Sequence, residues 1–402
     1  MSLRPRELYL NKLIKLKDEP FIKVISGVRR CGKSSILDLF ERYLSDNGIK
    51  GSNIIRFNFD SRELRTSIKD GDDLYDLVKN NLGTGRNYIL LDEIQNVEGW
   101  EGGLISMYTD MDADLYVTGS NAVMLSPDLG TKLVGRYIEI EVLPLSFKEW
   151  LDFDDGDNKD LQASFEKYLR YGGFPAITLM GEESLKKTAL DGIYRTILDL
   201  DVGGKNNVRD PALLRILAEY LIDNVGKIVS PKSIADYLTS EGRKTTHNTV
   251  DNYIMMMERA FLIYRNKRYD IKGKMLLQRL EKFYIVDPGL RGLILSSWKS
   301  DYGSILENIV YLELRRRGYS VSTGKFGEQE VDFVATRGNE CVYMQVTVSM
   351  ADENVRVREL RPLTSIQDGY PKMVVSTDPD VINDYGGIKN INIIKWLLNE
   401  SS

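Results

Sequence analysis

The sequence predicts an α/β fold divided into several domains, with a parallel sheet near the start of the chain. At 402 residues the chain is too long for one ordinary hydrophobic core. Apolar β-rich runs alternate with stretches whose apolar residues recur at helical spacing, as in parallel α/β sheets. The composition then becomes basic, and strand patterns return towards the end. We therefore expect an α/β domain over 1–150, a helical segment over 151–204, a basic helical domain with a hairpin over 205–282, and a second α/β domain over 283–402.

The composition excludes several classes of active site. The only histidine is His247, and the two cysteines, Cys31 and Cys341, are far apart in the sequence. Triads built on an imidazole base and zinc sites built on histidines are therefore not expected. Any catalysis must use carboxylates, lysines, arginines and a hard metal such as Mg²⁺.

The chain contains 42% hydrophobic and 28% charged residues, which is typical of a globular protein. No apolar run approaches the length of a membrane span, and the beginning of the chain lacks the pattern of a signal peptide. The cysteines also make no metal or redox spacing. We expect a cytoplasmic protein with no membrane partner.

The strongest motif is Gly27-Val-Arg-Arg-Cys-Gly-Lys-Ser34, which fits G-x-x-x-x-G-K-[ST] at every fixed position. An apolar run precedes it and a helical pattern follows it, which is the strand–loop–helix context of a phosphate-binding loop (P-loop). Backbone N–H groups and the helix N-terminus would hold the phosphates, Lys33 would reach the β/γ oxygens, and Ser34 would ligate Mg²⁺. The residues expected to bind ATP are Gly27, Val28, Arg29, Arg30, Cys31, Gly32, Lys33, Ser34 and Ser35.

An acidic pair, Asp92-Glu93, ends the apolar run "NYILLDEIQNV". A P-loop protein holds its metal at the carboxyl end of a buried strand of this kind. Asp92 is therefore expected to bind Mg²⁺ through water, and Glu93 to polarise the attacking water.

Three further polar residues are candidates for catalysis. Ser120 and Asn121 end the next expected strand, where they would bond the γ-phosphate or the lytic water, or simply cap the strand. Arg136 precedes another β-rich run. It would either neutralise charge in the transition state, from its own chain or across a subunit contact, or make a structural ion pair.

These motifs, in this order, resemble a family of prokaryotic AAA-type ATPases that carry a C-terminal domain of unknown function. The resemblance covers nearly the whole chain. It implies an ATPase core, a helical lid with a winged-helix segment, and a nuclease-like end domain. The matching stretches are "GVRRCGKSS", "LLDEIQ", "TGSNA", "LVGR" with "LPLSFKEW", "YGGFP", "FLIYRNKRYDIKGK" and "KFYIVDPGLR".

The segment over 205–282 contains fifteen Lys and Arg residues against nine Asp and Glu residues. Three helical patterns followed by a charged hairpin predict a winged helix-turn-helix, which would bind either duplex DNA or a protein. Polar side chains of the third helix and cations of the hairpin would contact DNA. These candidates are Thr246, His247, Asn248, Asn252, Arg265, Lys267, Arg268, Lys272 and Lys274.

The C-terminal segment reads as α-β-β-β-α-β, the order of a PD-(D/E)xK, or restriction-endonuclease-like, core. Glu307 lies near the start of the helix, Glu330 and Asp332 share one face of a strand, and Gln345 and Thr347 share one face of the next. An active nuclease would carry Glu-x-Lys where Gln345 and Thr347 stand, to hold Mg²⁺ and assist the attacking water. We therefore expect a degenerate nuclease-like domain.

Three functions follow from these patterns. The first is an Mg²⁺-dependent ATPase whose nucleotide state acts as a switch on the winged helix and the end domain. The second is a DNA-binding regulator tuned by ATP. The third, which Gln345-x-Thr347 disfavours, is a metal-dependent nuclease. A protein partner and an oligomer are compatible with all three.

Overall fold

The computed structural model describes residues 3–120, 133, 135–156, 160–204, 208–295, 301–379 and 384–399. The chain divides into two compact units. The first comprises Met1–Val142 with Arg259–Phe261, and the second comprises Leu143–Glu258 with Leu262–Ser402. Within the described residues, no helix combines the length and the apolar character that crossing a bilayer requires.

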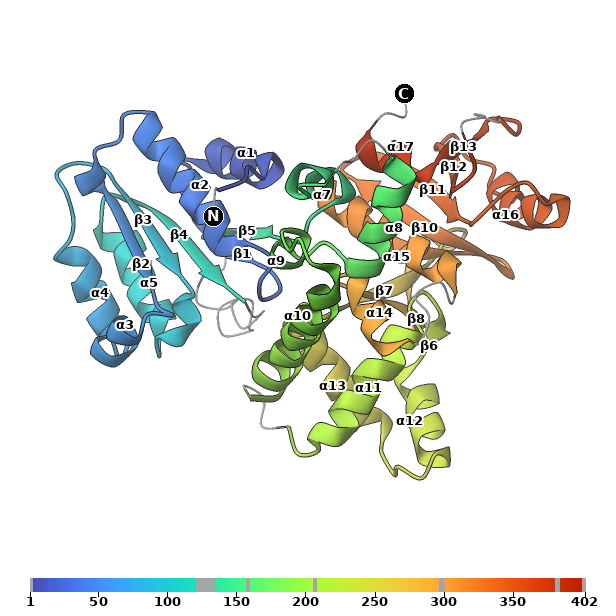
Figure 1. Ribbon diagram of the computed structural model, residues 1–402, viewed down its shortest axis with the longest axis horizontal. Coiled ribbons are helices and arrows are strands. Elements are labelled where there is room, and N and C mark those ends of the chain that lie inside the picture. The colour runs from blue at the N-terminus through green and yellow to red at the C-terminus, as the bar shows by residue number, and fades with distance from the viewer. Residues whose placement is uncertain are drawn as a thin grey trace. The chain divides into compact units, whose positions relative to one another are not determined.

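The first unit is built on a parallel five-stranded sheet with the order β2-β3-β4-β1-β5 (Figure 1). The strands β1 and β3 are buried along their whole length, as expected where both faces of a sheet are covered. The parallel α/β fold predicted for the start of the chain is therefore confirmed. The strands are β1 (Ile22–Ser26), β2 (Ile54–Asn58), β3 (Asn87–Asp92), β4 (Ala113–Gly119) and β5 (Tyr137–Glu141).

Helices cover both faces of this sheet. On one face, Phe40 of α2 packs against Tyr116 of β4, with 4.6 Å between the ring centroids. The next residue of β4, Val117, points to the opposite face, where it joins side chains of α4 and α5 in one hydrophobic cluster. The helices of this unit are α1 (Glu7–Leu16), α2 (Lys33–Asp46), α3 (Arg62–Ser67), α4 (Gly71–Lys79) and α5 (Trp100–Asp110).

The second unit contains a mixed eight-stranded sheet with the order β13-β12-β11-β10-β9-β7-β8-β6. The hairpin predicted in the basic segment is formed by β7 and β8, and it is part of this sheet because β7 pairs with β9. The hairpin and the C-terminal strands therefore share one sheet. The strands are β6 (Ile228–Val229), β7 (Ile263–Asp270), β8 (Met275–Ile285), β9 (Ser320–Phe326), β10 (Gln329–Arg337), β11 (Glu340–Val346), β12 (Lys372–Ser376) and β13 (Ile388–Asn392).

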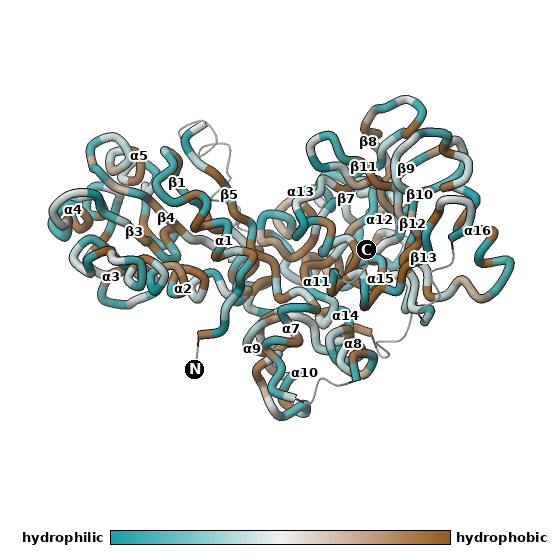
Figure 2. The backbone as a smooth tube through the Cα atoms, turned by 90° about the horizontal axis from the view of Figure 1, so that it is seen from above, coloured by the Kyte–Doolittle hydropathy of each residue, from teal (hydrophilic) through white to brown (hydrophobic). Residues whose placement is uncertain are grey.

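Several helices of the second unit begin at residues that cap their N-termini. Ser146 and Ser230 form capping boxes, and Asp160 and Asp210 accept hydrogen bonds from backbone N–H groups of the first turn. The helices alternate between hydrophobic and hydrophilic residues along their length (Figure 2). They are α7 (Phe147–Phe153), α8 (Leu161–Tyr171), α9 (Pro175–Thr178), α10 (Glu183–Thr196), the π-helical segment η4 (Ile197–Gly204), α11 (Pro211–Asp223), α12 (Pro231–Ser240), α13 (His247–Arg259), α14 (Gly289–Ile294), α15 (Tyr302–Arg316), α16 (Glu353–Ser365) and α17 (Ile393–Leu398).

The C-terminal part of the chain contains the elements α15-β9-β10-β11-α16-β12 in this order. This is the α-β-β-β-α-β order that the sequence predicts for the C-terminal segment.

The stretch "YGGFP" packs against a buried carboxylate from a distant part of the sequence. Asp287 is fully buried and accepts hydrogen bonds from the backbone N–H groups of Gly173, at 2.6 Å, and Gly289, at 2.9 Å. Gly172 has φ +77°, and a β carbon there would lie 1.7 Å from Asp287 Oδ1. Burial raises the pKa of Asp287 to about 7, although the backbone donors oppose this rise. The contact joins the α8–α9 turn to the start of α14.

Candidate functional site

The P-loop motif forms the turn between β1 and α2, and α2 begins at Lys33. Gly27 and Gly32 have φ values of +142° and +102°. A β carbon at Gly27 would lie 2.2 Å from the carbonyl oxygen of Val142, so only glycine fits there. The N–H groups of the first turn of α2 have no acceptors within the helix, which makes this end suitable for phosphate.

Lys33 lies across this loop. Its side chain is 4% exposed, and Nζ donates hydrogen bonds to the carbonyl oxygens of Gly27, at 3.0 Å, and Val28, at 3.2 Å. Both of these acceptors are neutral, so phosphate oxygens would give the ammonium group a stronger partner.

The other loop residues differ in exposure. Val28 and Cys31 are buried, and burial raises the pKa of the Cys31 thiol. Arg29 and Ser34 are half-buried, whereas Arg30 and Ser35 are exposed. The side chains of Val28 and Cys31 therefore pack in the core, and only their main chain is suited to contact phosphate.

Asp92 ends β3, which is separated from β1 by β4 alone. Its carboxyl end therefore lies about 10 Å from that of β1, given the usual spacing of strands. Asp92 is fully buried, and Oδ1 accepts a hydrogen bond from the hydroxyl of Thr118. Its Oδ2 lies 3.2 Å from Nη2 of Arg56, which also contacts Asp38 at 3.1 Å. A buried carboxylate at this edge is the kind of ligand that Mg²⁺ prefers.

Glu93 has a left-handed backbone, with φ +53°. Its N–H donates to Thr118 Oγ1 at 3.0 Å, and its carboxylate accepts a hydrogen bond from the side chain of Gln95. Non-glycine residues in this conformation are uncommon and are concentrated at functional sites. The residue predicted to act on water is thus held in an unusual backbone geometry next to Asp92.

Ser120 and Arg136 lie in different places relative to the P-loop, and Asn121 lies outside the described residues. Ser120 follows β4 and is fully buried, and among the described residues its hydroxyl has no hydrogen-bond partner. An unpartnered buried hydroxyl at this edge fits a bound ligand.

Arg136 requires a correction. The N–H of Ile22 donates to the carbonyl of Arg136, because β5 runs parallel to β1 from that point. Arg136 is therefore at the amino end of β1, about 16 Å along the strand from the P-loop at 3.3 Å per residue. Its side chain is exposed. The prediction that Arg136 acts on a nucleotide in its own chain is wrong, because parallel pairing places it at the other edge of the sheet.

In the second unit, the predicted nuclease residues lie close together around a residue that the sequence did not suggest. Glu307 comes from α15, and Glu330 and Asp332 come from β10. Nζ of Lys282, on β8, lies 2.8 Å, 2.9 Å and 3.5 Å from carboxylate oxygens of these three residues, respectively. Lys282 and its three acids are called the lysine–carboxylate cluster below.

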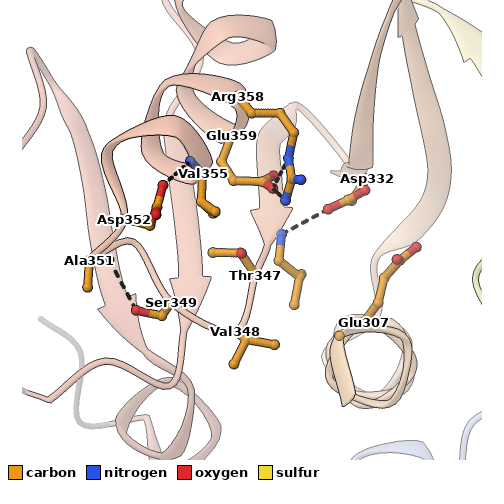
Figure 3. Close-up of a pocket in the computed structure, with 12 residues that line it drawn as sticks. Glu307, Asp332, Thr347, Val348, Ser349, Ala351, Asp352, Val355, Arg358 and Glu359 are labelled. Atoms are coloured by element: carbon orange, nitrogen blue, oxygen red, sulfur yellow. Dashed lines mark hydrogen bonds and ion pairs between the residues drawn. The ribbon is translucent and has the colours of Figure 1, made fainter. Parts of the chain in front are cut away.

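Gln345 and Thr347 lie next to this cluster. The side chain of Gln345 accepts a hydrogen bond from the N–H of Asp332 at 2.6 Å and donates one to Glu359 at 3.0 Å. Thr347 lines a cavity of about 600 Å³ together with Glu307, Asp332 and Glu359 (Figure 3). Burial and the charge of Glu307 raise the pKa of Asp332 to about 7, although Lys282 opposes this rise.

The metal ion that an active nuclease would hold does not fit these carboxylates. Across the described part of the chain, no group of three or more His, Cys, Asp or Glu residues is arranged to hold a metal ion. The Lys282 ammonium is already in contact with all three acids. The signal for Lys282 was weak: a charged residue in the otherwise apolar run "KFYIV", which needs an anionic partner once it is buried.

The DNA candidates separate into exposed and neutralised side chains. Arg265 is 17% exposed and lies 2.8 Å from Asp251, 3.2 Å from Glu258 and 3.2 Å from Glu281. The prediction that Arg265 contacts DNA is corrected, because three carboxylates surround its guanidinium. Arg268 is half-buried. The exposed candidates are Thr246, His247, Asn248, Asn252, Lys267, Lys272 and Lys274.

Comparisons with known proteins match family models to two parts of the chain. An AAA domain family matches residues 19–151, and a domain of unknown function, DUF8612, matches residues 162–301. Among solved structures, the Walker-type ATPase of Pyrococcus abyssi is 17% identical, covers 72% of this chain and 95% of its own, and has a TM-score of 0.49.

Two relatives match over most of their length. An uncharacterized protein of Haemophilus influenzae is 40% identical over 98% of this chain and 98% of its own. Uncharacterized protein MJ1544 of Methanocaldococcus jannaschii is 31% identical over 95% of this chain and 86% of its own. The chain carries a P-loop AAA-type ATPase domain and belongs to the same protein family as these two relatives.

Proposed function

We propose that the chain is an Mg²⁺-dependent ATPase whose nucleotide state acts as a switch on its second unit. One observation carries this proposal: Lys33, in the loop that follows β1, and Asp92-Glu93, at the end of β3, lie at the same edge of one parallel sheet. Ser120 follows β4, the strand between them, and its buried hydroxyl has no hydrogen-bond partner among the described residues. This is the arrangement that phosphoryl transfer requires, because that reaction depends on positioning and on charge stabilisation.

Each residue has a distinct role in the proposal. The main chain of the loop and Lys33 bind the β- and γ-phosphates of ATP. Ser34 and Asp92 would hold Mg²⁺, which neutralises charge on the phosphate oxygens. Glu93 orients and deprotonates the attacking water, and Ser120 donates to a phosphate oxygen or to that water.

Two variants separate binding from turnover. Lys33→Ala should weaken ATP binding at least tenfold and abolish turnover, because Lys33 contacts phosphate in both states. Glu93→Gln should retain ATP binding within about twofold and lose at least 100-fold in turnover, within the range of general-base effects. Lys50→Ala, at an exposed lysine of the same unit, is the control. Unchanged affinity and turnover in Lys33→Ala would rule out the proposal.

The second unit is proposed to contain a helical lid, a winged helix-turn-helix over α11–α13 with the β7–β8 hairpin, and a nuclease-like core over α15–β12. The order of the elements and the predicted helix and hairpin positions support this assignment. Hydrolysis in the first unit would change the state of these parts, and ATP turnover with and without a partner measures that coupling.

A second function, ATP-tuned binding of duplex DNA, is favoured by the exposed cations of the hairpin. Neutralising Lys267, Lys272 and Lys274 together should reduce the slope of log affinity against log salt by about one unit for each lost phosphate contact. The matched control replaces Lys50, Lys69 and Lys79, which are exposed lysines of the first unit. Equal loss in both triple variants would exclude a specific DNA surface on the hairpin.

A further inference from the structure

Lys282 has the geometry of a cation ligated by carboxylates. Its three acidic partners come from α15 and β10, and a carboxylate oxygen of each lies within 3.5 Å of Lys282 Nζ. Glu307 is further held by the hydroxyl of Tyr284 at 2.5 Å. Gln345 stands where a nuclease would carry a metal-binding carboxylate. Its side-chain amide accepts a hydrogen bond from the N–H of Asp332 and donates one to Glu359.

The burial of this cluster explains why a cation is needed. Lys282 is 3% exposed, and a buried charge without a partner costs several kcal/mol. Burial alone would lower the pKa of Lys282, but the charges of Glu307, Asp332 and Glu330 outweigh it and raise that pKa. Lys282 is therefore charged at neutral pH, and without it the carboxylates would repel one another.

The balance of charge leaves little reason for a second cation. Glu330 is partly exposed, so water screens its charge. The deeper acids are Glu307 and Asp332, whose side chains are 12% and 16% exposed and whose carboxylates both lie within 3.5 Å of Lys282 Nζ. The Lys282 ammonium therefore already pairs with both of the deeper acids.

We infer that Lys282 replaces a divalent cation in the second unit. Its ammonium group supplies the positive charge that Glu307, Glu330 and Asp332 require, and it thereby excludes a metal ion from them. The inference stands independently of ATP binding in the first unit. It means that the second unit keeps the carboxylates of a nuclease-like site as a metal-free ion-pair network.

The test is Mn²⁺ binding to the full-length chain, measured by electron paramagnetic resonance. All variants carry Asp92→Asn, so that the P-loop site contributes as little as possible. With Lys282 present, adding Asp332→Asn should leave the number of bound Mn²⁺ ions unchanged. Lys282→Met should gain one bound Mn²⁺ per chain, at least tenfold tighter than before, and adding Asp332→Asn should remove it. Lys282→Arg keeps the charge and should gain none.

Two outcomes would overturn the inference. The first is Mn²⁺ bound in the presence of Lys282 and lost with Asp332→Asn, which would reveal a working metal site. The second is a folded Lys282→Met chain that gains no Mn²⁺. If Lys282→Met unfolds without metal, its thermal unfolding is measured with and without Mn²⁺. A folding transition that Mn²⁺ restores, and that Asp332→Asn abolishes, supports the inference. A transition that Mn²⁺ does not restore contradicts it.

Discussion

Arg56 on β2 contacts Asp92 at the end of β3, with 3.2 Å between Nη2 and Oδ2. The same nitrogen lies 3.1 Å from Asp38 of α2. Arg56 thus supplies positive charge to two acids at the edge where Mg²⁺ is proposed to bind. Without metal, this guanidinium is what separates the negative charges of Asp38 and Asp92.

Arg56→Gln should therefore destabilise the metal-free chain by about 1–3 kcal/mol, because Asp92 is buried and loses its cationic partner. Saturating Mg²⁺ and ATP should recover most of this loss, since Mg²⁺ supplies the missing charge. Thermal unfolding with EDTA and with Mg²⁺–ATP measures both states. Arg86→Gln is the control, because Arg86 also bridges two carboxylates, Asp18 and Asp112, but near the start of β3. An equal recovery of Arg86→Gln would contradict the prediction.

Arg136→Ala should leave the ATP affinity of the single chain unchanged within about twofold. The residue lies about 16 Å from the P-loop along β1, beyond the reach of its side chain. Equilibrium binding at low protein concentration checks this. A different result is a turnover of Arg136→Ala that falls below that of the native chain only at high protein concentration, and that recovers when the Lys33→Ala chain, which keeps Arg136, is added. That result would place Arg136 at the site of a neighbouring chain. A tenfold loss of affinity at low concentration would show that the arginine acts within its own chain.

The two sites differ in how far sequence could predict them. The P-loop and the Asp92-Glu93 pair are each a short continuous stretch of sequence at the carboxyl end of a parallel strand. Local pattern and the rule for strand ends were therefore sufficient to predict where these residues lie. The position of Arg136 depends on the register of β5 against β1, which no local pattern records. Lys282 meets its acids only because β8, α15 and β10 pack together.

Arg265→Ala should destabilise the second unit by about 2–4 kcal/mol, because it leaves Asp251, Glu258 and Glu281 without their shared cation. The salt dependence of any DNA binding should not change, since Arg265 is already neutralised. Urea unfolding and salt titration measure these two effects. Arg243→Ala is the control, because its pair with Asp210 is exposed and 3.8 Å long and should contribute less than about 1 kcal/mol. Equal losses of stability would show that burial of the Arg265 cluster has no energetic consequence.

Gly172→Ala should destabilise the second unit by at least about 2 kcal/mol. Its φ of +77° disfavours any β carbon, and that carbon would overlap the carboxylate of Asp287. Gly192→Ala is the control, because Gly192 lies inside α10 with open space around it. There alanine should be neutral or stabilise by up to about 1 kcal/mol. Thermal unfolding compares the two, and similar midpoints would contradict the packing described for Gly172.

The same contact predicts how stability depends on pH. The folded state raises the pKa of Asp287 from 3.8 to about 7, so between these values the folded chain binds more protons than the unfolded chain. The contribution of Asp287 to stability is therefore fully present below about pH 4 and decreases until about pH 7. A shift of this size corresponds to at most about 4 kcal/mol.

Asp287→Asn removes this titration and keeps the shape of the side chain. The free energy of unfolding of this variant minus that of the native chain should therefore increase as the pH rises from 5 to 7.5. Urea unfolding at both pH values, following the transition that Gly172→Ala shifts, provides the measurement. Other titrating groups cancel in the comparison because both chains share them. If the difference stayed constant, Asp287 would carry its charge in the folded state at pH 5, and its backbone donors, rather than its burial, would set its protonation.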